Sequence, residues 1–165
     1  MPRPGYLICA ASGSLDQYTE AVSLFNIIES IGVSAVNPRG DGTIAIPPPM
    51  SMRIIAVWLK GENDAPEDRF ETEIAGYAPV DGRPLFRADF PAFQFGNPVR
   101  RFIVPAVVFP PTTVVAPGLM RFECGIRREG DASWLVVQQY FVVVVEAADE
   151  GETPQLPAEP PESSS

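Results

Sequence analysis

Residues 133–146 read Ser-Trp-Leu-Val-Val-Gln-Gln-Tyr-Phe-Val-Val-Val-Val-Glu, and this stretch decides the fold. It is dense in β-branched and aromatic side chains, which crowd an α-helix but suit the pleated surface of a sheet. It is also shorter than the roughly 20 apolar residues that a membrane-spanning helix needs. The stretch therefore predicts one long β-strand.

In the second half of that strand, residues 140–145, the side chains that point to either face of the sheet are all apolar. Both faces of this half are therefore expected to be covered. A chain of 165 residues has few segments with which to cover the second face. Either another segment folds over it or another subunit does, so this half is our candidate protein interface. Its residues are Tyr140, Phe141, Val142, Val143, Val144 and Val145.

The preceding segment, which opens at Pro117-Gly118, predicts a partner strand for this one. Its alternation is the clearest in the chain: one face is apolar, and the other carries arginine, glutamate and glycine. A polar turn at residues 129–131 joins the two strands, so together they predict a β-hairpin. The apolar face holds Met120, Phe122, Cys124 and Ile126; the other face holds Arg121, Glu123, Gly125 and Arg127.

The rest of the chain is also β-like. Residues 6–11, 52–59, 69–77 and 101–109 predict strands, the last at a sheet edge or bulge because Pro105 interrupts it. Residues 20–31 fit a helical or a strand pattern, and the β character of the remainder favours a strand. The prediction is an all-β fold, an antiparallel β-sandwich of about six to eight strands with little helix.

An aromatic segment at residues 85–97 is harder to interpret. It contains Phe86, Phe90, Phe93 and Phe95, but Pro91 interrupts it. We interpret it as a packed loop with one short strand, and as a segment that could cover one face of the last strand.

Charge is concentrated at the end of the chain. The net charge is −9, and the six acidic residues from Glu146 onward have no basic neighbour. The proline-rich tail at residues 147–165 has almost no large apolar side chain, so burial cannot offset its ordering entropy, and we expect disorder there. Residues 1–146 are expected to form a single domain. The acidic balance argues against nucleic acid and anionic membranes as partners.

The chain contains no histidine. This absence rules out Ser-His-Asp and Cys-His catalysis and imidazole metal ligands. Cys9 and Cys124 form neither a Cys-x-x-Cys pair nor a zinc set, and we interpret them as buried free thiols. No cofactor is expected. No targeting signal is evident, so the expected location is the cytoplasm.

Three sets of polar residues are candidates for a chemical site. The acidic loop at residues 62–68 lacks the spacing of a calcium loop and is interpreted as a solvated turn. Glu71 and Glu73 are interpreted as an exposed charged face rather than a glycosidase pair. Five arginines could form an anion site, but cross-strand pairing with Glu71, Glu73 and Glu123 explains them more simply. They are Arg100, Arg101, Arg121, Arg127 and Arg128.

The order of certain segments resembles that of a small, uncharacterised bacterial β-rich family. These segments are Leu7-Ile8-Cys9-Ala10-Ala11, then Ser23-Leu24-Phe25-Asn26-Ile27-Ile28, a proline, Arg53-Ile54-Ile55-Ala56-Val57-Trp58-Leu59, and the Gly118-to-Phe122 strand. The resemblance spans roughly residues 6–145 and contains no diagnostic catalytic motif. It implies a bacterial or phage-associated source and an unassigned function, and it carries over no functional residues.

Three functions remain open at this point. The first is a non-catalytic binding or assembly module that associates with itself or with another protein subunit through residues 140–145 or through sheet edges. The second is a sandwich that binds carbohydrate or a small hydrophobic molecule. Its candidate platforms are Trp58, Trp134, Phe86 and Phe90. The third, an enzyme, has to work without histidine, and we expect no enzymatic activity.

The tail offers a direct test of the predicted domain organisation. Deleting residues 147–165 is expected to leave the melting temperature nearly unchanged, because a segment without large apolar residues contributes little burial. Thermal unfolding followed by circular dichroism measures this. A large drop in melting temperature would mean that the tail packs against the domain.

Overall fold

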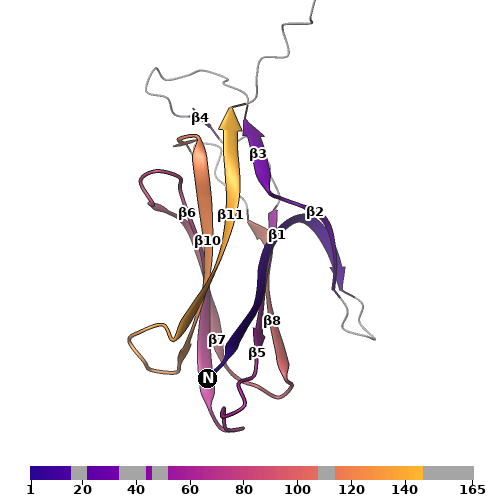
Figure 1. Ribbon diagram of the computed structural model, residues 1–165, viewed down its shortest axis with the longest axis vertical. Helices are drawn as coiled ribbons and strands as arrows, with labels where there is room; N and C mark the ends of the chain where they lie inside the picture. Colours follow the sequence, from indigo (N-terminus) through magenta and orange to yellow (C-terminus); the bar gives the residue numbers. More distant parts are fainter. Residues whose placement is uncertain (16–21, 34–43, 46–51, 108–113, 147–165) are drawn as a thin grey trace, which may run out of the picture.

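The computed structural model describes residues 1–15, 22–33, 44–45, 52–107 and 114–146. In these ranges the chain forms strands and no helix. None of them therefore contains a helix that is long and apolar enough to cross a membrane. Nine strands form two sheets that pack face to face and enclose the core between them (Figure 1).

The four-stranded sheet has the order β2-β1-β5-β8, and all its neighbours are antiparallel. Its strands are β1 (Arg3–Leu15), β2 (Val22–Ile27), β5 (Met52–Leu59) and β8 (Val99–Val107). The first part of β1 pairs with β5, and its last part pairs with β2. The strand β2 is therefore an edge strand attached only to the end of β1.

The five-stranded sheet has the order β3-β11-β10-β6-β7, and only the β3–β11 pair is parallel. Its strands are β3 (Ser30–Val33), β6 (Arg69–Tyr77), β7 (Pro84–Gln94), β10 (Gly118–Arg128) and β11 (Val136–Glu146). Two further strands of two residues each, β4 (Ile44–Ala45) and β9 (Val114–Val115), pair with each other and form a separate small sheet.

The two sheets share one apolar core. It is built from the inward side chains of β5, β6, β10 and β11, as expected for a sandwich whose inner faces interdigitate. The largest fully buried side chains are Trp58, Phe70, Phe122, Met52, Ile54, Ile74, Met120, Ile126, Val142 and Val144. The inward alternation predicted for β10 is confirmed by the complete burial of all four apolar residues on that face.

The predicted all-β sandwich and its carboxyl-side hairpin are confirmed. Strands β10 and β11 pair antiparallel from Gly118 opposite Val144 to Ile126 opposite Val136. The predicted strand at residues 101–109 corresponds to β8, which lies at a sheet edge as its proline requires. The segment at residues 22–31 forms strands β2 and β3, so the preference for strand over helix was correct within the described residues.

The prediction of a packed loop at residues 85–97 was wrong. Most of this segment forms β7, an 11-residue strand. Pro91 is tolerated there because β7 is an edge strand and its register with β6 shifts between Phe70 and Thr72, next to the proline. A proline at a bulge of an edge strand costs no ladder hydrogen bond.

One polar group inside the core connects the two sheets. The Thr72 hydroxyl donates to the Gly125 carbonyl at 2.6 Å and accepts a hydrogen bond from the Trp58 indole N–H at 3.2 Å. Trp58 comes from the four-stranded sheet, whereas Thr72 and Gly125 come from the five-stranded sheet. A buried donor without an acceptor is costly, so this hydroxyl lets a tryptophan occupy the centre of the core.

Thr72→Val is expected to lower the free energy of unfolding by about 2 kcal/mol, because it leaves the buried Trp58 N–H without this acceptor while preserving side-chain volume. Urea unfolding followed by tryptophan fluorescence measures the change. Thr72→Ser, which keeps the hydroxyl, is the control and is expected to lose less. Equal stability of the Val variant and the native protein would contradict the role assigned to the hydroxyl.

Candidate functional site

One end of the outer face of the five-stranded sheet carries four exposed apolar side chains from β10 and β11. Their exposed fractions are 57% for Leu119, 47% for Phe141, 39% for Val143 and 42% for Val145. We call these four residues the apolar patch. No described segment lies over them, so within the described chain they face solvent.

The register of the hairpin brings the patch together. Leu119 lies directly opposite Val143. Side chains alternate between the two faces of a strand, so Phe141, Val143 and Val145 all point outward beside Leu119. Residue spacing within β11 thus gathers four apolar groups on two neighbouring strands, at the end where β3 also pairs with β11.

The six predicted interface residues divide equally between the two faces of β11. Val142 and Val144 are buried, and Tyr140 is half-buried with its hydroxyl donating to the Ile28 carbonyl at 3.0 Å. These three face the core. The other three belong to the apolar patch.

The expectation that both faces are covered is therefore met on only one side. The opposite sheet covers the inner face. The aromatic segment at residues 85–97 was one candidate cover for the other face, and the sheet order excludes it. Its strand β7 is the far edge of the same sheet, separated from β11 by β10 and β6. Within the described residues, no other segment covers the outer face of β11.

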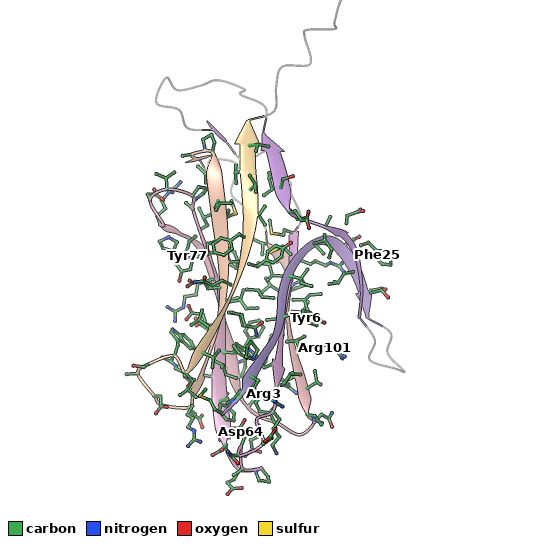
Figure 2. All side chains as sticks on the ribbon, viewed as in Figure 1. Arg3, Tyr6, Phe25, Asp64, Tyr77 and Arg101 are labelled. Atoms are coloured by element: carbon green, nitrogen blue, oxygen red, sulfur yellow. The ribbon has the colours of Figure 1, made fainter. Side chains whose placement is uncertain are left out.

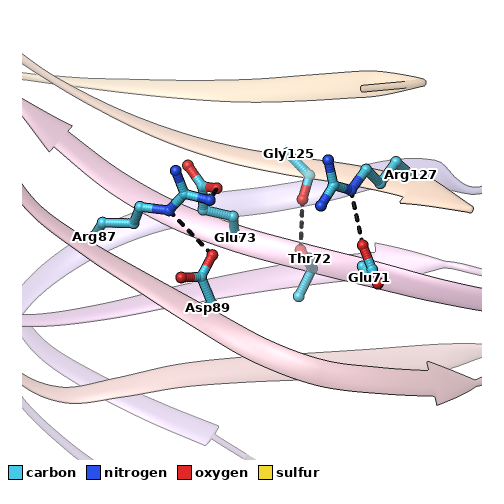
Figure 3. A network of polar contacts seen from close by, with 7 residues as sticks. All are labelled: Glu71, Thr72, Glu73, Arg87, Asp89, Gly125 and Arg127. Carbon is cyan, nitrogen blue, oxygen red and sulfur yellow. Dashed lines mark hydrogen bonds and ion pairs between the residues drawn. The ribbon is translucent and has the colours of Figure 1, made fainter. Parts of the chain in front are cut away.

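Much of the rest of this outer face is polar and internally paired, although Val137, nearer the other end of β11, is 42% exposed. Arg127 pairs with Glu71 at 2.8 Å, and Arg87 pairs with Glu73 at 2.6 Å (Figure 3). Nearer the patch, Arg121 pairs with Glu123 at 3.2 Å along one strand. The Gln139 amide also donates to the Glu123 carboxylate at 2.8 Å.

The predicted cross-strand pairing with one of the five arginines is thus observed for Glu71. Glu123 instead pairs with Arg121 along its own strand, and Glu73 pairs with Arg87, which the sequence reasoning missed. The five arginines do not gather. Arg100 and Arg101 belong to β8 in the other sheet, and Arg101 projects from the opposite side of the molecule to Tyr77 (Figure 2). The Arg100 guanidinium lies 5.6 Å from the ring centre of Phe93, an aromatic contact rather than part of an anion site.

The carboxyl group of Glu73 lies in a partly buried, charged environment on this face. Burial raises the pKa of its carboxyl, and the neighbouring Arg87 charge opposes that rise. Glu71 contacts a different arginine, so the two glutamates do not act on a common point. Their arrangement is that of a charged strand face, without the shared cleft that glycoside hydrolysis requires.

The acidic loop at residues 62–68 uses two of its carboxylates for its own backbone. Asp64 accepts a hydrogen bond from the Gly61 N–H at 2.7 Å and forms an ion pair with the Met1 amino group. Asp68 accepts one from the Ala65 N–H at 2.9 Å. Within the described residues, no group of three or more acidic or cysteine side chains is placed to hold a metal ion.

The four candidate ligand platforms differ in accessibility. Trp58 is completely buried and so offers no surface to a ligand. Phe86 and Phe90 lie on the inward side of β7, partly buried against the core. Trp134 keeps 36% of its surface exposed. It lies against Gly125, where an added Cβ would come within 2.8 Å of the indole.

Leu119 is the patch residue that the sequence reasoning did not select. The sequence does contain a pattern that points to it. Leu119 belongs to the same outward-facing set of alternate residues as Arg121 and Glu123, but it is apolar where those residues are charged. An apolar side chain on the solvent phase of an alternating strand indicates a contact surface.

The two cysteines offer no reactive thiol in the folded protein. Both are free and completely buried. Burial raises the pKa of Cys9 to about 12 and that of Cys124 to about 11. Because the thiolate is the reactive form, these groups are chemically inert at neutral pH.

The comparisons with known proteins reach only weak similarity. No family model and no curated protein matches the chain, in agreement with its resemblance to an uncharacterised family without a diagnostic motif. Among solved structures, a β-glucuronidase from Bacteroides uniformis aligns with a TM-score of 0.43 and 19% identity, over 71% of this chain and 14% of that one.

Two further structures of β-glucuronidase 2 from the same organism align over 71% of this chain and 15% of theirs, each at 19% identity. One is a calcium-binding mutant with a TM-score of 0.43, and the other is covalently bound to cyclophellitol-6-carboxylate aziridine, with a TM-score of 0.40. The chain thus spans about one seventh of the length of these enzymes. Similarity of this degree says nothing about the activity or ligands of this chain.

The burial of the thiols leads to a simple prediction. In the folded protein at pH 7, a maleimide reagent is expected to label neither Cys9 nor Cys124, because fewer than about one thiol in a thousand is ionised and neither is accessible. Unfolding in urea should expose both. Mass spectrometry counts the labels, and rapid labelling of the native protein would contradict the described burial.

Proposed function

We propose that this protein is a non-catalytic assembly module that binds a second copy of itself through the apolar patch. The observation that carries the proposal is the patch itself: four neighbouring apolar side chains on two paired strands, each 39–57% exposed. Contiguous exposed apolar groups bordered by polar residues are typical of protein–protein contact sites.

The energetics favour burial of the patch. Removing a Val, Leu or Phe side chain completely from water contributes about 1.5–3 kcal/mol, and roughly half of each patch residue is still exposed. A symmetric contact buries the patch twice, once on each copy. The gain then becomes large enough to compete with the loss of translational and rotational freedom on association.

The surroundings of the patch limit where the contact forms. Beside the patch, towards β6 and β7, the outer face is a ladder of paired charges, and desolvating such pairs brings little net stability. The contact is therefore centred on the apolar end of β10 and β11, with charged groups at its rim. Such an arrangement matches the apolar centre and polar rim of known interfaces.

A second copy is the partner that the geometry favours. Two sheets pack face to face at about 10 Å when the residues between them are apolar. Because the patch is apolar, it can pack in this way against the same patch of a second copy. A two-fold contact uses one surface twice and closes after two copies, so it needs no second complementary surface.

The test compares two lysine substitutions of exposed phenylalanines. The native protein is expected to be dimeric by multi-angle light scattering at micromolar concentration. Phe141→Lys places a charge within the contact and is expected to weaken association at least tenfold. Phe25→Lys is the control, because Phe25 is 52% exposed but lies on β2, in the other sheet (Figure 2).

The control is expected to keep the native molar mass. A native protein that remains monomeric across the accessible concentration range would overturn the proposal. So would a dimer that Phe141→Lys leaves intact, because the contact would then lie elsewhere.

A further inference from the structure

We infer that the two copies pack with their β11 strands antiparallel, about a two-fold axis that crosses the Leu119–Val143 pair. This inference rests on the proposed self-association and specifies its geometry. Two face-to-face arrangements are possible for a two-fold contact between flat sheets. In one the facing strands run antiparallel, and in the other they run parallel.

The register of the hairpin favours an axis at the Leu119–Val143 pair. These two residues lie directly opposite each other across the hairpin. With the axis there and the facing strands antiparallel, Leu119 faces its own counterpart and Val143 faces its own. Phe141, two positions before the axis, faces Val145, two positions after it. Every residue of the apolar patch then meets an apolar residue of the other copy.

Moving the axis along the strand destroys this match. An axis at the neighbouring outward pair, Arg121 and Phe141, places two arginines against each other. It also brings Leu119 opposite Glu123. Both contacts desolvate charged groups without an opposite charge directly facing them, which is costly.

The acidic end of the chain excludes the parallel arrangement. The run from Glu146 onward contains six acidic residues and no basic one, and it begins where the patch ends. In a parallel contact the two positions 146, from which these acidic runs continue, lie side by side. In the antiparallel contact, positions 146 of the two copies lie about 20 Å apart along the strands, since a strand rises about 3.3 Å per residue.

That separation exceeds the screening distance of about 8 Å at physiological ionic strength. Charges at the two positions 146 therefore repel each other little. The same geometry provides an attraction. Arg121, whose side chain is 42% exposed, lies two positions from the axis and so comes beside residue 145 of the other copy. A guanidinium of one copy then lies beside the end of β11 of the other copy.

Cysteine cross-linking tests this geometry. Val143→Cys and Val137→Cys are matched substitutions, because both valines are about 40% exposed and point outward from β11. In the antiparallel contact, two copies of residue 143 face each other. Two copies of residue 137 are separated by twelve positions along the strand, or about 40 Å. The native cysteines are buried, so the native protein is the blank.

Each variant is treated with a short bismaleimide at a concentration where light scattering finds the native dimer. Val143→Cys is expected to give at least ten times more covalent dimer than Val137→Cys. Efficient cross-linking of both variants would indicate the parallel arrangement and overturn this inference, while leaving self-association through the patch intact. Cross-linking of neither variant in a dimeric protein would overturn the inference and the proposed function together, as would a monomeric native protein.

Discussion

The structure depends on one constraint: successive side chains of β11 point to opposite faces, and at residues 140–145 both sets are apolar. Towards the core, Val142 and Val144 are buried by the opposite sheet. The polar inward groups of the strand find partners there, since Gln138 donates to the Val57 carbonyl at 2.9 Å across the two sheets. The outward set has no equivalent cover in the described chain. Among the described residues, the sandwich covers one face of the hairpin and leaves the other exposed.

The outer face of the five-stranded sheet is charged at one side and apolar at one end of β10 and β11. Towards β6 and β7 the same face is lined by arginine–carboxylate pairs, such as Arg127 with Glu71. Those pairs are compatible with water and discourage close packing, because a second sheet would have to desolvate them. The apolar patch is the part of the face where desolvation is favourable. The distribution of polar and apolar residues on two strands therefore sets where the proposed contact would form and how far it would extend.

Much of the fold was predictable from the sequence, because β10 and β11 carry periodicity and composition that only a sheet satisfies. The strand β7 was missed since Pro91 reads as a breaker, and only its place at a sheet edge makes the proline acceptable. The candidate site was half predictable. Residues 140–145 were selected, but the sheet order decides which of them face outward and whether residues 85–97 cover them. Likewise, the sequence could not separate Trp58 from Trp134, because the burial of Trp58 depends on the hydroxyl of Thr72 from the other sheet.

The central claim is that one face of β11 is closed and the other open within a single subunit. Methyl NMR in the presence of a soluble paramagnetic agent, on protein diluted until it is monomeric, measures this directly. The account predicts strong relaxation enhancement for the methyl groups of Val143 and Val145 and little for those of Val142 and Val144. Equal protection of all four valines in the monomer would contradict it, because both faces would then already be sealed within one molecule.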